Sequence, residues 1–468
     1  DATVTASDVT GNSLQAQTNK QTLANVPLLD PTVMNSTFLK QQGFRGYYTM
    51  SGPSTDRYNL AAGAAGKSKE TQVLISAREL DPSQVPASWV NTHLQYTHGY
   101  GAVLAAANQS GVDPSDGYPT FSLSSLPPQG QPPINAQPRI YFDTNALSSS
   151  GYVIANSNQA ELDYENPSGG EVTNHYDGTG GVPVGGIVRR SAFALSFGDF
   201  NILISGQVKP GSRVIYYRNV VQRLENAAPF LSYDGDPYPV VINGRLYWVE
   251  DAYTTTSNFP YAQQANPVGT SRLPGTSELG YESFNYIRNS VKCVVDAYNG
   301  TMWFFVQDPN DPIIEVYERA FPKLFTKMTA ANSIIPNITS HWRYPEDLFT
   351  VQTDMYGRYH QTNAQVFYTN SQQWGIAQNP SSGEVNAATT TVPPLPGALV
   401  PVQQAPAQSV MPIYELTALP DQTQQSFVLV QPFVPYSNGD KQNLTAFMTA
   451  ASDPDDYGQL TVFTIPAG

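Results

Sequence analysis

Proline and glycine recur so often along this chain that they limit the length of any regular element. The sequence holds 38 prolines and 35 glycines among 468 residues. Proline lacks a backbone donor and glycine favours turns, so both residues interrupt helices and strands. We therefore expect short elements joined by many turns and by long irregular connections.

The length predicts more than one packed lobe, because a single domain usually holds roughly 100–200 residues. Changes in composition and pattern divide the chain into five parts. They are a flexible lead-in at 1–20, an N-terminal α+β lobe at 21–185, a central helix and hairpin lobe at 186–377, a Pro/Ala/Thr-rich loop at 378–411, and C-terminal strands at 412–468 that pack back on the core.

Two hairpins are predicted from Asn-Gly pairs, since a type I′ turn needs positive φ at both central residues. One spans Pro239–Trp248 around Asn243-Gly244, and the other spans Lys292–Val306 around Asn299-Gly300. Further strands are predicted at 68–76, 138–143, 151–156, 412–416, 426–434 and 459–464.

Helices are predicted mainly in the middle of the chain, from apolar residues at helical spacing. The predicted helices are 82–107 around Trp89, Leu94 and Tyr96, ending in a Gly-Tyr-Gly turn at 99–101; a face with Phe193, Phe197, Phe200 and Ile204; a face from Val214 to Ala228 capped by Ser212; one opened by Asp311-Pro312 and ended or kinked at Pro322; and one from Pro345 with Leu348, Gln352, Met355 and Tyr359. The predicted class is α+β, with mixed, mainly antiparallel sheets, hairpins and a central cluster of helices.

The charge balance excludes two kinds of direct partner. The net charge is −14, although charged residues make up only 13% of the chain. Nucleic acid and anionic membrane surfaces repel such a chain unless a local basic patch attracts them. The densest basic cluster, Arg189 and Arg190, is only a pair. We therefore expect neither nucleic acid nor an anionic membrane surface to bind this segment directly.

Membrane-spanning and secretory segments are not evident in the sequence as given. Apolar runs such as Ala102–Ala107 are far shorter than the ~20 residues that a membrane helix needs. No signal peptide pattern precedes Asp1. We expect a soluble piece, trimmed or processed from a longer protein.

The lone cysteine, Cys293, allows neither an internal disulfide nor a cysteine-based metal site. It lies in the apolar run Val291–Val295. Such a residue typically behaves as a small buried hydrophobe. We expect Cys293 to be buried on the second hairpin, inert and unliganded.

His93 and His98 are the one histidine pair close in sequence. A metal pair on a helix has a spacing of four, whereas a spacing of five places the side chains on different faces. Structural histidines that pack beside Trp89 and Tyr96 are favoured over a metal site.

Asp234 and Asp236 flank a glycine and could contribute to a calcium site. Calcium needs six to eight oxygens, so carbonyls and a further carboxylate such as Glu250 or Asp251 would have to complete the site. The same residues are those that a tight turn requires. We favour the turn and predict no bound metal, with calcium as the one cofactor to test.

Asp251, Asp296, Tyr253 and Trp248 could line a polar cleft that suits carbohydrate. Glycoside chemistry uses two carboxylates that face each other, which the sequence alone does not establish. Nucleophile-elbow, phosphate-loop and dinucleotide motifs are not present in the sequence. No residue is predicted to be catalytic.

Several long strings, unlike generic repeats, make the sequence resemble uncharacterised protein family 0182, whose members are bacterial integral membrane proteins common in actinobacteria. The strings are Ser-Ala-Arg-Glu-Leu at 76–80, the Trp-Val-Asn-Thr-His string at 89–101, Tyr-Asp-Gly-Asp-Pro-Tyr-Pro within 228–241, Trp-Val-Glu-Asp-Ala-Tyr within 248–255, the Asn-Ser-Val-Lys-Cys string within 285–300, and His-Trp-Arg-Tyr-Pro-Glu-Asp-Leu-Phe at 341–349.

The resemblance implies membrane helices, absent from this chain, and a large domain on the extracytoplasmic side of the cell membrane. It implies no catalytic residues. It also suggests, by analogy, a membrane-anchored PDZ serine protease as a partner. We therefore expect an envelope interaction or assembly module of otherwise unknown function. The alternative is an envelope protein that binds or processes carbohydrate.

Overall fold

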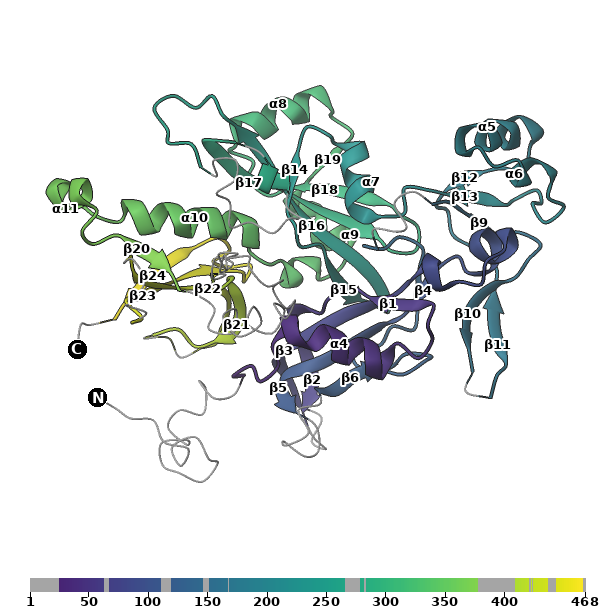
Figure 1. Ribbon diagram of the computed structural model, residues 1–468, viewed down its shortest axis with the longest axis horizontal. Helices are drawn as coiled ribbons and strands as arrows, with labels where there is room; N and C mark the ends of the chain where they lie inside the picture. The colour runs from purple at the N-terminus through teal and green to yellow at the C-terminus, as the bar shows by residue number, and fades with distance from the viewer. Residues whose placement is uncertain are drawn as a thin grey trace, which may run out of the picture.

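The computed structural model describes residues 25–62, 67–110, 119–145, 151–166, 168–265, 278–281, 283–377, 409–420, 422, 424–436 and 443–465. The expected lead-in at 1–20, and 378–408 of the predicted loop, lie outside the described residues. Figure 1 shows three main sheets and a smaller arm at the upper right. Almost all strand pairs are antiparallel, so the predicted α+β class with mainly antiparallel sheets is confirmed.

The N-terminal sheet is built around the long strand β3, with α4 lying on it. Its strands are β1 (Tyr48–Met50), β2 (Ser54–Ala62), β3 (Lys67–Leu80), β5 (Ala102–Ser110), β6 (Pro119–Ser124) and β7 (Gln129–Gly130). Helix α4 (Pro31–Gln42) begins at Asp30, whose carboxylate accepts from the Thr32 amide at 2.8 Å. Phe38 of α4 packs against Leu74 and Val103 of the sheet.

Of the helix predicted over 82–107, only a helical turn at 89–95 is confirmed, and the rest is wrong. The segment forms η1 (Pro82–Gln84), the short helical turn η2 (Asn91–Gln95), strand β4 (Gly99–Tyr100), which pairs with β8 (Arg139–Ile140), and then strand β5. Residues 102–107 pair between β3 and β6 and are buried. Burial between two neighbouring strands outweighs the high intrinsic helix propensity of alanine, because tertiary context overrides local preference.

The central sheet carries the two predicted hairpins. Its strands are β14 (Ser232–Tyr233), β15 (Tyr238–Ile242), β16 (Arg245–Thr256), β17 (Tyr286–Asp296), β18 (Met302–Val306) and the parallel β19 (Phe325–Lys327). Asn243 and Gly244 both have positive φ, so the first turn is confirmed as type I′. In the second turn only Gly300 does, so type I′ is wrong there.

One core joins the N-terminal and central sheets. Val73 and Leu104 of the first sheet share it with Trp248 and Val295 of the second. Strand β15 also contacts β3 directly. The two sheets are therefore one packed body.

Of two further predicted helices, one is confirmed and the other begins at another residue. Helix α8 (Pro312–Ala320) is confirmed, and Asp311 accepts from the Ile313 and Ile314 amides at 3.1 and 3.2 Å. Helix α7 (Val220–Ala227) begins at Asn219 rather than at Ser212, because Val214 belongs to strand β13 (Arg213–Ile215).

The arm contains a three-stranded sheet with two helices on it (Figure 1). It consists of β9 (Val153–Ala155), β12 (Val182–Pro183), β13, α5 (Ile187–Phe197) and α6 (Asn201–Ile204), with the hairpin β10 (Glu161–Glu165) and β11 (Glu171–Asn174) beside it. Gly198 adopts positive φ and ends α5, so the single helical face predicted from Phe193 to Ile204 is wrong.

The C-terminal sheet packs against α10 (Glu346–Tyr359), which follows Pro345 as predicted. The sheet consists of β20 (Trp374–Ile376), β21 (Ile413–Thr417), β22 (Ser426–Pro435), β23 (Ala446–Ala451) and β24 (Leu460–Thr464).

The remaining elements are η4 (Glu278–Tyr281), η5 (Met328–Ala330), α9 (Ala331–Ile334), η6 (Ile338–His341) and α11 (Ala364–Thr369). Among the described helices, none has both the length and the apolar character needed to cross a membrane.

Candidate functional site

Four of the six sequence strings meet in one buried polar cluster, where the central sheet contacts the start of α10. We call this cluster the Lys292 network. It consists of Asp234, Asp236, Asp251, Lys292, Arg343 and Asp347. All of these residues are buried except Asp236, which is partly exposed. The network therefore holds more carboxylates than basic groups away from solvent.

Lys292 and Asp251 form the centre of the network. The β16–β17 register places them opposite each other, and Lys292 Nζ lies 2.6 Å from Asp251 Oδ1. Lys292 also donates to the carbonyl of Arg343, and Asn289 donates to Asp251 at 2.7 Å. Burial lowers the pKa of Lys292, although Asp251 acts in the opposite direction. The pair is thus held by the sheet register and closed from solvent.

Arg343 connects three elements through its guanidinium. It donates to Asp236 Oδ2 at 2.7 Å and to the carbonyl of Thr55 on β2 at 2.9 Å. It also lies 3.7 Å from the centre of the Tyr238 ring, a cation–π contact. Burial alone would lower the pKa of Arg343, but Asp236 together with Tyr414, Tyr238 and Glu346 outweighs burial, and the pKa is raised. The arginine stays charged and holds the N-terminal and central sheets together.

Asp234 sits beside a second carboxylate, that of Asp347. Tyr253 donates its hydroxyl to Asp234. The Asp347 amide donates to Asp234 at 3.3 Å, and the Gly235 amide donates to Asp347 at 3.1 Å. Burial and then Asp347 raise the pKa of Asp234 well above its usual range. Each carboxyl group therefore accepts from a backbone amide of the other's segment, and a proton is favoured on Asp234.

Glu250 lies next to the network but on the opposite face of β16. It stands opposite Cys293, and its neighbours at Trp248 and Ala252 belong to the core shared by the two sheets. Glu250 is 1% exposed, and neither carboxyl oxygen has a hydrogen-bond partner among the described residues. Burial and then Asp234 raise its pKa well above the usual range. The neutral acid is the form that this environment favours.

Of the four residues of the predicted polar cleft, Asp251 belongs to the network, Tyr253 donates to it through Asp234, and the other two lie elsewhere. Asp251 and Tyr253 contribute to it, as described above. Asp296 instead accepts from the Tyr298 and Asn299 amides at the hairpin end, at 2.8 and 2.9 Å. Trp248 is buried in the core and donates its indole NH to the carbonyl of Phe142 at 2.9 Å. The two carboxylates, Asp251 and Asp296, therefore have separate surroundings.

The calcium candidates are already engaged by other groups. Asp236 pairs with Arg343, and Asp234 accepts from Tyr253 and from the Asp236 amide at 3.1 Å. Within the described ranges, no group of three or more His, Cys, Asp and Glu side chains is arranged to hold a metal ion. Calcium binding remains a matter for experiment.

The two histidines lie apart and make different hydrogen bonds. His93 Nδ1 lies 2.7 Å from the carbonyl of Tyr152, and its ring stacks on that tyrosine. His98 Nε2 lies 3.0 Å from Asp163 Oδ1. Burial would raise the pKa of Asp163, but hydrogen bonds from His98 and Arg139 lower it to about 2. Both histidines are hydrogen-bonded within the fold, as the structural interpretation predicted.

Cys293 is fully buried on β17, as predicted, and burial raises the pKa of its thiol well above the usual range. A thiol with a raised pKa forms little thiolate, which is the reactive species. Its predicted inertness therefore has a physical basis, although labelling is needed to test it.

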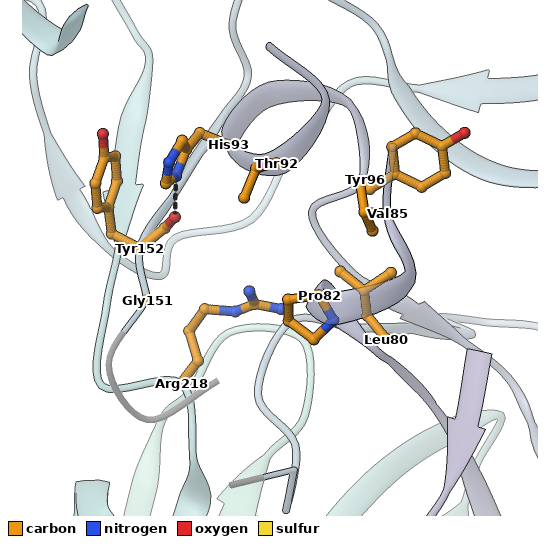
Figure 2. Close-up of a pocket in the computed structure, with 9 residues that line it drawn as sticks. All are labelled: Leu80, Pro82, Val85, Thr92, His93, Tyr96, Gly151, Tyr152 and Arg218. Atoms are coloured by element: carbon orange, nitrogen blue, oxygen red, sulfur yellow. Dashed lines mark hydrogen bonds between the residues drawn. The ribbon is translucent and has the colours of Figure 1, made fainter. Parts of the chain in front are cut away.

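A small cavity lies between η2, the end of β3 and the start of the arm. Figure 2 shows His93, Tyr152 and Arg218 around it, with Tyr96 at its side. Its volume is about 50 Å³. A space of this size holds water rather than a substrate. It lies at the joint between the arm and the N-terminal sheet.

A larger depression, which we call the α10 groove, runs along one side of α10 and has a volume of about 450 Å³. It is lined by Leu348, Val351, Gln352, Met355, Tyr356 and Tyr359 of α10, by Gln263, Ala265 and 284–287 of the central lobe, and by Met448 and Leu460 of the C-terminal sheet. None of these lining residues is charged. The spacing of Leu348, Gln352, Met355 and Tyr359 predicts the stripe on α10, but local spacing does not show that the stripe lines a groove.

Comparison with known proteins places the chain in a family. The model of Uncharacterised protein family UPF0182 matches residues 2–468. The chain belongs to this family. The UPF0182 protein of Cupriavidus necator is 39% identical over 97% of this chain and 45% of its own length. Those of Trichodesmium erythraeum and Methanospirillum hungatei are both 36% identical, over 97% and 95% of this chain.

The chain spans under half the length of these UPF0182 relatives, at 45%, 46% and 44%. The relatives come from diverse bacteria and archaea, so the family extends beyond actinobacteria. No solved structure matches the chain.

Proposed function

We propose that this chain is the extracytoplasmic part of an integral membrane protein and that it works there by binding other envelope proteins. The membrane anchor and the placement outside the cytoplasm rest on the family resemblance. The observation that supports binding is the α10 groove.

The groove has the chemistry of a protein-binding surface. Tyr356, Tyr359 and Leu460 on its walls are 36%, 46% and 40% exposed, respectively. Exposed apolar patches of this kind on soluble proteins usually mark interaction sites. Met355, which is partly buried, adds a flexible side chain that adapts to a partner. Because no lining residue is charged, the groove fits an uncharged apolar segment, such as one face of an amphipathic helix.

The Lys292 network favours binding over catalysis. A hydrolytic site needs carboxylates that reach a substrate. Here Asp251 is 4% exposed and paired with Lys292, and Asp234 is 4% exposed and bonded to Tyr253. The strings that distinguish this sequence thus build an internal support for the fold. For the same reason we do not extend the proposal to carbohydrate.

Purification of the full-length protein from membranes in mild detergent tests the proposal. The matched variants are Tyr359→Asp in the groove and Val316→Asp on α8, a valine that is 58% exposed and distant from the groove in sequence and element. We expect a discrete partner with the wild type and with Val316→Asp, and its loss with Tyr359→Asp. A membrane-anchored PDZ serine protease is the first candidate partner.

Two results would count against the proposal. One is repeated recovery of the full-length protein alone. The other is a partner that both variants retain equally, because the groove would then have no part in binding.

A further inference from the structure

The outer end of the arm exposes a set of large apolar side chains. We call residues 182–215, which run from β12 through α5 and α6 to β13, the α5–α6 tip. Figure 1 shows the tip at the end of the molecule farthest from the C-terminal sheet. Five of its side chains are between 62% and 78% exposed: Ile187, Val188, Leu195, Phe200 and Ile204.

The exposure of these five side chains does not result from a missing core in this part of the arm. The tip buries Ala194 of α5, Ile202 of α6 and Val214 of β13 in one core, which it shares with η2 and β9. Val188 and Leu195 are seven residues apart and therefore lie on one stripe of α5, which faces away from that core. The tip thus buries one apolar face and presents another to solvent.

The tip is also basic, in contrast to the rest of the chain. It contains four basic residues, Arg189, Arg190, Lys209 and Arg213, and one acidic residue, Asp199, whereas the whole chain carries a net charge of −14. Asp199 is occupied, because it accepts from Trp89 and Tyr152 at 2.9 and 2.7 Å. These neutral donors leave its negative charge in place, so the tip carries a formal charge of +3, from four basic residues and one acidic residue.

Three of the basic side chains gather around β12. Arg189 donates to the carbonyl of Pro183 at 3.2 Å, and Arg190 donates to that of Val184 at 3.3 Å. Arg213 stands opposite Pro183 in the β12–β13 register. The arginine pair noted in the sequence is thus joined in space by a third cation. A local basic patch of this kind attracts an anionic surface, even though the chain as a whole is acidic.

We propose that the α5–α6 tip docks on the surface of an anionic lipid bilayer. Apolar side chains on a helix beside basic residues are the combination that binds the boundary between headgroups and acyl chains. Charges elsewhere on the chain act weakly at the tip, because the Debye length is about 8–10 Å at physiological salt. The tip and the α10 groove are different surfaces. Lipid binding by the tip does not depend on protein binding by the groove.

Flotation of the purified chain with lipid vesicles tests the proposal. Vesicles of phosphatidylcholine with about a third phosphatidylglycerol are compared with vesicles of phosphatidylcholine alone, because anionic headgroups should attract the basic tip. The tip variant is Leu195→Asp/Phe200→Asp. The matched control is Leu28→Asp/Val316→Asp, which replaces side chains that are 62% and 58% exposed elsewhere.

We expect the chain to float with the anionic vesicles, and binding to weaken at high salt. The tip variant should lose about tenfold or more in binding, and the control should bind like the wild type. A charge variant, Arg189→Glu, should weaken binding to anionic vesicles while the melting temperature stays unchanged.

Three results would overturn the proposal. They are no binding to either vesicle, equal binding by the tip variant and the wild type, and binding that does not depend on the anionic lipid. Chemical cross-linking in native membranes identifies the other possible occupant, a protein. If the wild type forms a protein cross-link that the tip variant loses, and the wild type does not float with vesicles, then the tip binds a protein and the lipid proposal is wrong.

Discussion

The ammonium group of Lys292 lies 2.6 Å from Oδ1 of Asp251, and the two side chains are 0% and 5% exposed. The residues are directly opposite each other on β16 and β17. Two long hydrogen-bonded strands therefore fix an ion pair inside the protein. Removing two charges from water is costly, so the pair depends on both partners and on the donors around them.

Lys292→Met should lower the free energy of unfolding by about 3–5 kcal/mol, because it leaves the Asp251 carboxylate buried without its cation. Urea unfolding followed by tryptophan fluorescence measures the change. The double variant Lys292→Met/Asp251→Asn should recover much of the loss. A loss below about 1 kcal/mol in the single variant would mean that the pair is far better solvated than its burial indicates.

Glu250→Gln should leave stability at pH 5 almost unchanged and raise it at pH 8 relative to the wild type. The pKa of Glu250 is raised in the folded state, so its contribution is complete at low pH and is lost as pH rises above the usual carboxyl range. Each pKa unit corresponds to about 1.4 kcal/mol. Melting temperatures at the two pH values provide the test. If Glu250→Gln instead lowers the melting temperature more at pH 8 than at pH 5, the folded protein is stabilised by the ionised form of Glu250.

Glu79 predicts a second pH dependence in the N-terminal sheet. It is fully buried, and burial followed by the charge of Asp143 raises its pKa to about 8. The folded state therefore holds a proton that the unfolded chain releases above its ordinary pKa of 4.5. Stability should fall between about pH 5 and pH 8, by up to about 1.4 kcal/mol per pH unit.

The variant Glu79→Gln should flatten this decline, whereas Glu315→Gln on the exposed side of α8 should retain it. Chemical denaturation at a series of pH values measures both slopes. Identical slopes for Glu79→Gln and the wild type would show that Glu79 does not cause the decline of stability with pH.

Local signals in the sequence predicted the elements whose ends depend on a few neighbouring residues. Asp311-Pro312 opens α8, and Asn243-Gly244 forms a type I′ turn, because capping and turn geometry are set within four residues. Ala102–Ala107 was predicted as helix and is a strand, since its conformation depends on β3 and β6. Gly198 ended a helix that periodicity alone extended to Ile204.

The candidate sites depended still more on distant contacts. Asp251 and Lys292 are 41 residues apart, and Asp236 and Arg343 are 107 apart. Neither pairing follows from composition or spacing. The sequence showed that these residues belong to distinctive strings, and only the fold shows that the strings meet.

Gly300→Ala should destabilise the protein by about 1–3 kcal/mol. Gly300 has a φ of +66°, and a Cβ there would lie 2.3 Å from the buried ring of Phe142. Gly186→Ala is the control, since a Cβ at that position has nothing within 4 Å, and its effect should stay within about 0.5 kcal/mol. Thermal melts measure both. Equal effects would show that the hairpin tolerates the added methyl group.

The central claim, that the α10 groove binds another envelope protein, is tested most directly by photo-crosslinking in living cells. A photoreactive amino acid is placed in the full-length protein at Tyr359, in the groove, or at Val316, on the exposed side of α8. The account predicts a discrete adduct with a second protein from position 359 and none from position 316. The absence of an adduct at position 359, or the same adduct from both positions, would contradict it.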